Sequence, residues 1–161
     1  MARFRFRLEA SLRIAEQALE TAQRTFAQEV QLWKNLVEAC ELQQVQFNDG
    51  QEGQREAGRH RPDELGLWQL FVSEQQLRLH QCKAELSEQE LMMEKARHTL
   101  METHREVEKL EHLKEKMAKA FEVAELQKEQ KILDETGQVL HWSHQIASEN
   151  DQYHMNGRTN L

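Results

Sequence analysis

Proline, glycine and aromatic residues are scarce in this 161-residue sequence, which has one Pro, six Gly and 6% aromatic residues. Such a composition excludes most sheet-rich folds, because their turns need Gly and Pro and their strands favour aromatic side chains. Hydrophobic residues make up 39% of the chain. That fraction is too small for a thick globular core, but it is enough for a narrow seam between long helices.

Cysteine is also rare, and long apolar runs are absent. Cys40 and Cys82 are too few for a disulfide-rich scaffold, so reduced thiols in a cytosolic protein are the expectation. The sequence has no run of about 18 apolar residues, which argues against a transmembrane helix. Its first residues lack the apolar stretch of a secretory signal.

The charge is acidic and unevenly placed. Residues 1–62 carry nine basic and nine acidic residues, so the net charge of -7 belongs to the remainder of the chain. The one basic cluster is Arg3, Arg5 and Arg7. Because phosphate contacts need a basic stripe, this balance argues against nucleic-acid binding. A disordered chain is the alternative that a mean hydropathy of -0.84 allows.

Regular apolar spacing argues against disorder and predicts two helices. The segment from Asn48 to Asp63 holds three of the six Gly and the only Pro, Pro62. It predicts a polar turn over about 48–63, with Asp63 as a candidate N-cap of the helix that follows. We therefore expect one coiled-coil domain, residues 1–161, with helices at about 4–47 and 64–148 and a frayed tail at 149–161.

Apolar residues in both predicted helices follow heptad spacing, with alternating steps of three and four. In the first helix, the step from Phe26 to Val30 is a second consecutive four, which resembles a stutter. The second helix keeps one register with polar interruptions at Gln89, Thr103 and Lys114. Its apolar members are Leu79, Cys82, Leu86, Met93, Ala96, Leu100, Val107, Leu110, Met117, Phe121 and Ala124.

The two predicted helices differ in length. At 1.5 Å per residue they span roughly 60 and 125 Å, so an antiparallel hairpin leaves the last 30 to 40 residues of the second helix without a partner in the chain. These residues still carry an apolar stripe, which indicates that another subunit or another protein covers it. The stripe comprises Met117, Phe121, Leu126, Ile132, Leu133, Val139 and Trp142.

Both ends of the sequence resemble the FliJ family of the flagellar type III export apparatus. The start, Phe4-Arg5-Phe6-Arg7-Leu8, is similar to the N-terminus of that family. The segment 129–135, Glu-Gln-Lys-Ile-Leu-Asp-Glu, resembles a stretch near the end of the family's second helix. The resemblance implies an all-α, antiparallel two-helix coiled-coil hairpin with a longer second helix, similar to the γ subunit of rotary ATPases.

This resemblance also implies partners and surfaces. A FliJ-like stalk would bind and activate the hexameric export ATPase FliI, contact the export gate protein FlhA and interact with export chaperones, at the cytoplasmic face of the membrane at the flagellar base. Trp68 and Phe71 are the candidates for the gate. The implied ATPase-binding residues, with Trp142 added for its exposed position, are Phe4, Arg5, Phe6, Arg7, Leu8, Gln130, Lys131, Leu133, Asp134, Glu135 and Trp142.

The residue pattern argues against both a metal site and an enzyme. His104, Glu108 and His112 share a helix face, but that face is predicted to be solvated, so we expect no metal site. Paired carboxylates such as Asp134 and Glu135 lack a pocket, so we expect neither an enzyme nor a cofactor.

Two further patterns leave alternatives open. Cys40 and Cys82 fall on the two apolar seams and are interpreted as small packing residues, with a redox clamp between the helices as the alternative. The alternation of Arg and Phe over residues 3–7 has the period of a strand. We favour a helix lead-in or an exposed docking tip over an edge strand for these five residues.

Three functions are consistent with the sequence. The first is the stalk of flagellar protein export, and the second is the related stalk of a virulence type III secretion system. The third belongs to another class, a cytoplasmic coiled-coil scaffold that dimerises through the unpaired end of its second helix. Sedimentation separates the third from the others, because only the scaffold is expected to form a stable dimer.

Overall fold

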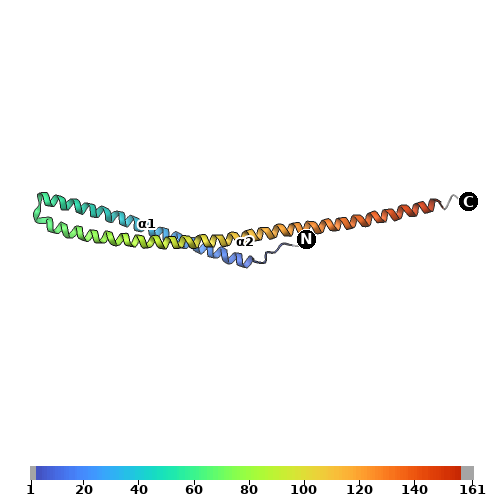
Figure 1. Ribbon diagram of the computed structural model, residues 1–161, viewed down its shortest axis with the longest axis horizontal. Coiled ribbons are helices and arrows are strands. Elements are labelled where there is room, and N and C mark those ends of the chain that lie inside the picture. Colours follow the sequence, from blue (N-terminus) through green and yellow to red (C-terminus); the bar gives the residue numbers. More distant parts are fainter. Residues whose placement is uncertain (1–2, 157–161) are drawn as a thin grey trace. The chain divides into compact units, whose positions relative to one another are not determined.

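Two long helices joined by a short bend make up the computed structural model, which describes residues 3–156 and the side chains of residues 3–151 (Figure 1). Helix α1 spans Glu9–His60, the 3-10 turn η1 spans Pro62–Glu64, and helix α2 spans Leu65–Asn156. No strand occurs in residues 3–156. The predicted all-α fold is confirmed, and α2, with 92 residues, is longer than α1, with 52.

Contacts along the chain define two compact units. The hairpin unit, Leu8–Leu110, contains α1, η1 and the first half of α2. The terminal unit combines Met1–Arg7 with Glu111–Leu161. Within the described residues, neither helix has a stretch long and apolar enough to cross a lipid bilayer.

The boundaries of α1 correct the sequence prediction. The helix begins at Glu9 rather than at about residue 4, and it continues to His60 rather than ending at about 47. Most of the predicted turn at 48–63 is therefore helical. Its glycines are used for close packing: a Cβ built on Gly53 would lie 2.5 Å from the ring of Trp68 on α2. No described glycine has a positive φ, so turn geometry is not their role.

The bend itself takes only a few residues. Arg61 leaves the helical conformation, with φ -140° and ψ 66°, and its backbone N–H donates to the carbonyl of Ala57 at 2.8 Å. Pro62 then opens η1. Asp63, predicted as a helix N-cap, lies inside η1 instead, and Arg61 occupies the position before this turn. At the other end, α2 reaches Asn156, beyond the predicted 148. The rest of the predicted tail, residues 157–161, lies outside the described part of the chain.

The seam of the hairpin unit follows the predicted heptads. The covered positions of α2 keep one register from Trp68 to Leu110. On α1 the predicted stutter is absent, because half-buried Glu29 continues the spacing between Phe26 and Trp33. Buried positions of α1 are mostly small, and no large side chain in the described part of the chain is fully buried. The seam is thin, and its buried α1 residues are Leu12, Ala22, Cys40, Gly50 and Ala57.

Polar side chains bridge the two helices at defined points. Gln75 is buried, and its side-chain oxygen accepts a hydrogen bond from Gln43. Gln89 donates to the backbone carbonyl of Glu29 at 3.1 Å and also to its carboxylate. Shifting the helices by one heptad would break these pairs and leave buried polar groups without partners. The polar pairs therefore favour a single register, and Gln89 is one of the polar interruptions that the sequence predicted.

Candidate partner-binding surfaces

An extended N-terminal arm, Arg3–Arg7, packs against α2 within the terminal unit. Phe6 is buried, Phe4 is half-buried, and the three arginines are exposed. The Phe4 ring centroid lies 5.7 Å from that of Phe121. An extended chain points successive side chains in opposite directions, so the period of two separates an apolar side against α2 from a basic side facing water.

The arm is therefore a lead-in to α1 rather than a strand, and only its arginines form an exposed tip. Lys114 Nζ lies 5.9 Å from the centroid of the Phe6 ring, within reach of a cation–π interaction. Lys114 was expected as a polar interruption of the seam, and here its charge lies over an aromatic face. The contact between Lys114 and Phe6 could not be predicted from local sequence pattern, because the two residues are more than 100 positions apart.

Phe6→Ala is expected to release the arm. Burying a Phe side chain contributes about 1.5–3 kcal/mol, so its loss should raise the population of the detached arm by at least about tenfold. Tryptic cleavage after Arg5 and Arg7, followed by mass spectrometry, measures this population. Phe4→Ala should accelerate cleavage less, because Phe4 is only half-buried. Equal cleavage of wild type and Phe6→Ala would show that the arm does not depend on this contact.

Exposed apolar side chains mark the second half of α2 in the terminal unit. Every described side chain from Leu126 to Asp151 is exposed. Four of these residues lie on one helix face, separated by seven, three and four positions. We name them the α2 stripe: Ile132, Val139, Trp142 and Ile146. Trp142 is 70% exposed. Large apolar side chains grouped on a free helix face are typical of a docking surface.

The predicted ATPase-binding residues separate into different places. Phe4 and Phe6 face α2, while Arg5 and Arg7 face water. Leu8 is half-buried at the start of the hairpin unit. The arm packs near Phe121 of α2. Gln130 lies nine residues after Phe121, which is about 14 Å along the helix axis at 1.5 Å per residue. The α2 members of the predicted set are all exposed: Gln130, Lys131, Leu133, Asp134, Glu135 and Trp142.

Trp68 and Phe71, the gate candidates, are partly structural. Their rings meet edge to face with centroids 5.9 Å apart, and they lie over Gly53 and Gly50 of α1. Phe71 keeps 40% of its surface exposed. Leu67 and Leu70 beside them are each 71% exposed, and neither was predicted from the sequence as a binding residue. The apolar surface near the bend is therefore larger than the two predicted residues.

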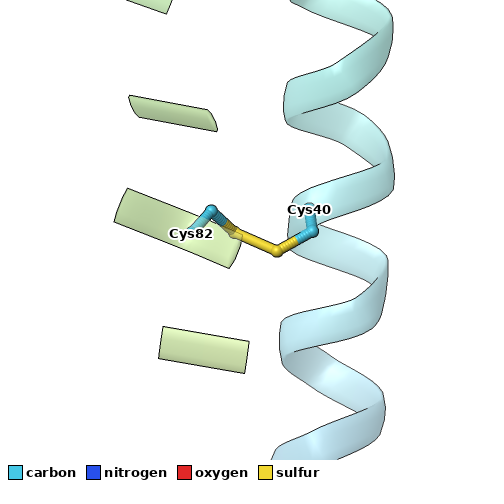
Figure 2. The surroundings of a disulfide bond; sticks show 2 residues. All are labelled: Cys40 and Cys82. Carbon is cyan, nitrogen blue, oxygen red and sulfur yellow. A yellow bond between two sulfur atoms is a disulfide. The ribbon is translucent and has the colours of Figure 1, made fainter. Parts of the chain in front are cut away.

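Cys40 and Cys82 are joined by a disulfide bond (Figure 2). Their Cα atoms are 5.7 Å apart, within the range that a disulfide spans. The preferred interpretation, two separate thiols used for packing, is wrong for this structure. The alternative of a clamp between the helices is the one that the structure contains.

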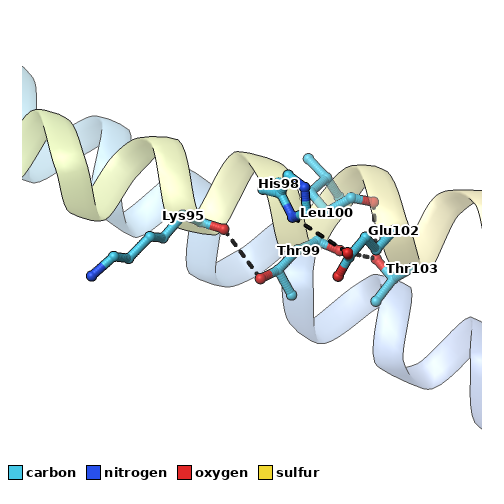
Figure 3. Close-up of polar contacts among 6 residues, drawn as sticks. All are labelled: Lys95, His98, Thr99, Leu100, Glu102 and Thr103. Atoms are coloured by element: carbon cyan, nitrogen blue, oxygen red, sulfur yellow. Dashed lines mark hydrogen bonds and ion pairs between the residues drawn. The ribbon is translucent and has the colours of Figure 1, made fainter.

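The middle of the hairpin unit has a groove of about 350 Å³ lined mainly by alanine and threonine. Its hydroxyl groups are already used: Thr99 donates to the carbonyl of Lys95, and Thr103 donates to those of Thr99 and Leu100 (Figure 3). Such bonds to the preceding helical turn leave no donor aimed at a ligand. The groove residues are Ala18, Thr21, Ala22, Thr25, Ala96, Thr99 and Thr103.

Charged residues on the helix faces pair within their own helix. His98 lies 3.4 Å from Glu102, as Figure 3 shows, and His104 lies 3.6 Å from Glu108. A hydrogen bond and the charge of Lys119 lower the pKa of Glu115, and the same contact raises the pKa of Lys119. Exposed pairs of this kind contribute little to stability. Within the described residues, no three His, Cys, Asp or Glu side chains group to hold a metal ion.

One comparison with known proteins gives a match. The family model described as "Flagellar FliJ protein" matches residues 4–145, a span that includes most of the arm, all of α1 and α2 up to residue 145, with Trp142. Neither a curated protein nor a solved structure matches the chain. Since the matched span covers most of the sequence and has the expected unequal helices, the chain belongs to the FliJ family of flagellar proteins.

Proposed function

We propose that this chain is a stalk of the flagellar type III export apparatus that binds and activates the hexameric export ATPase FliI and links it to the export gate protein FlhA. FliJ-family proteins are accessory components of flagellar protein export rather than enzymes. The observation that carries the proposal is the α2 stripe, an apolar helix face that is exposed in a member of this family. The role would place it at the cytoplasmic face of the membrane at the flagellar base.

The ATPase end of the stalk is proposed to lie in the terminal unit. Its apolar anchor would be Trp142, because exposed Trp side chains that enter a partner's pocket dominate binding energy. The exposed Arg3, Arg5 and Arg7 supply a basic side suited to acidic loops on a ring. Charges of this kind at the rim of an interface mainly set orientation and association rate.

Activation requires more than affinity. A stalk that speeds ATP hydrolysis must bind successive states of the ring with different strength, since equal binding to all states shifts no equilibrium. The paired helices of the hairpin unit suit this task because two helices resist bending better than one. The chain therefore needs no catalytic group, and the hydrolysis belongs to the ring.

The gate end is proposed to lie near the bend of the hairpin unit. Trp68 and Phe71 pack against two glycines of α1, and the exposed side chains of Leu67 and Leu70 lie beside them in the sequence. A rigidly placed apolar cluster loses little conformational entropy when a partner covers it. Export chaperones are proposed as additional partners, with no particular surface assigned to them.

The test is a pull-down of the hexameric export ATPase with the full chain, followed by measurement of its ATP hydrolysis rate. Retention of the ATPase and a faster rate are the expected results. An ATPase that neither binds nor accelerates would overturn the proposal.

A dimeric scaffold is the second candidate, and one observation favours it. Ile132, Val139 and Ile146 of the α2 stripe are seven residues apart, which is also the spacing of a coiled-coil interface between two copies. Sedimentation velocity at micromolar concentration separates the two functions. A monomer is expected for a stalk whose stripe awaits the ring, and a stable dimer would favour the scaffold. The related virulence secretion stalk is disfavoured because the matching family is flagellar.

A further inference from the structure

The hairpin unit contains one covalent link between its helices, and the proposed export role does not use it. Cys40 is 8% exposed and Cys82 is half-buried, so the two sulfur atoms lie in the seam with Cys82 on the more accessible side. They are 42 positions apart in sequence. Neither cysteine is free in the structure.

The surrounding contacts hold these cysteines opposite each other. On the bend side, Gln43 lies three residues from Cys40 and pairs with buried Gln75. On the other side, Trp33 Nε1 donates to Glu90 at 3.4 Å, and Gln89 donates to Glu29. The two sets of polar contacts enclose the cysteine pair along the seam and fix the same register.

Only one register allows the bond. Gln75 and Gln89 lie one heptad before and one heptad after Cys82. A slip of the helices by a heptad in either direction would place Cys40 opposite a glutamine, about 10 Å from Cys82 at 1.5 Å per residue. A disulfide needs Cα atoms within about 7 Å, so its formation reports and locks the observed register.

We propose that Cys40 and Cys82 are a reversible thiol–disulfide couple, oxidised by small-molecule disulfides such as glutathione disulfide, that locks the hairpin unit in one register. The seam is thin and interrupted by polar side chains, so the reduced hairpin depends on weak contacts that a single covalent bond can outweigh. The couple is a redox-sensitive switch between a covalently locked hairpin and one held in register by noncovalent contacts alone.

The exchange balances in two steps. The thiolate of Cys82, the more accessible residue, attacks glutathione disulfide, forms a mixed disulfide and releases one glutathione. The thiolate of Cys40 then attacks the Cys82 sulfur, closes the bond between the helices and releases the second glutathione. Two protein thiols are oxidised, one glutathione disulfide is reduced to two thiols, and the two protein protons pass to the released thiolates.

The experiment uses the full chain, reduced and then equilibrated with glutathione disulfide. Intact-mass spectrometry is expected to show a loss of about 2 Da, from two thiol hydrogens, without a lasting glutathione adduct. Thermal unfolding should show a melting temperature higher by on the order of 10 °C in the oxidised chain, because the bond closes a loop of about 42 residues. Reducing agent should reverse both changes.

A matched control keeps the cysteine count and moves one thiol to the exposed face. In the double variant Cys40→Ala with Glu41→Cys, position 41 is exposed and points away from the seam. This variant should collect glutathione adducts or form dimers, with no rise in melting temperature. Rapid adduct formation at both cysteines of the wild type, or equal melting of its oxidised and reduced forms, would overturn the proposal.

Discussion

Gly53→Ala is expected to destabilise the hairpin unit, although replacing glycine inside a helix normally stabilises it. The added methyl group would lie 2.5 Å from the Trp68 ring, so the ring must either strain or leave its place. Overpacking costs about 1–3 kcal/mol, and exposing a large ring costs a similar amount. Over most of this range, either cost exceeds the gain of about 1 kcal/mol from helix propensity. The melting temperature of the hairpin unit should fall by about 5–10 °C.

Gly137→Ala is the matched control, because a Cβ at this position meets no atom within 4 Å. It should raise the helix content of α2 or leave it unchanged. A second control removes the ring: in a Trp68→Ala background, Gly53→Ala should become stabilising. Circular dichroism melts of the wild type, the two single variants Gly53→Ala and Trp68→Ala, and the double variant form a double-mutant cycle. If Gly53→Ala stabilises the chain with Trp68 in place, the close packing near the bend is not a constraint.

The glycines near the bend also show where sequence prediction failed. Asn48, Asp49 and Gly50 form a strong turn signal, and Pro62 follows within the same segment. Local signals cannot distinguish a glycine that permits a turn from one that admits a neighbouring ring. That distinction depends on Trp68 and Phe71, which are close only once the hairpin has formed. The heptad pattern, in contrast, placed most seam positions correctly because it reflects burial along the whole helix.

The candidate surfaces were predictable to different degrees. Exposure of Trp142 followed from unequal helix lengths, which the apolar pattern already indicated. The arm was harder, because a period of two fits both a strand and an extended segment lying on a helix, and the covering residue Phe121 is distant in sequence. The spacing of Cys40 and Cys82 allowed a bond, but composition alone favoured reduced thiols. These features depend on contacts between distant segments rather than on local pattern.

Trp142→Ala is expected to weaken binding of the export ATPase by about 30- to 1,000-fold, if the α2 stripe is the docking surface. A Trp side chain buried at the centre of an interface typically contributes about 2–4 kcal/mol, which corresponds to that range. The side chain is 70% exposed in the free chain, so its removal should leave the melting temperature unchanged. Binding is measured by titration of the labelled chain with the hexamer, and stimulation of ATP hydrolysis should fall in parallel.

Leu91→Ala is the matched control for Trp142→Ala, because Leu91 is also an exposed apolar residue of α2, at 63%, but lies in the hairpin unit. Its affinity for the ATPase should change by less than about twofold, as expected for a residue outside an interface. Comparing the two variants tests whether binding depends on the place of the apolar side chain along α2 and not only on its exposure. A Trp142→Ala variant that binds like wild type, or a Leu91→Ala variant that binds as poorly, would remove the α2 stripe as the ATPase anchor. Because the hairpin folds around a separate seam, this result would leave the fold and the family assignment intact.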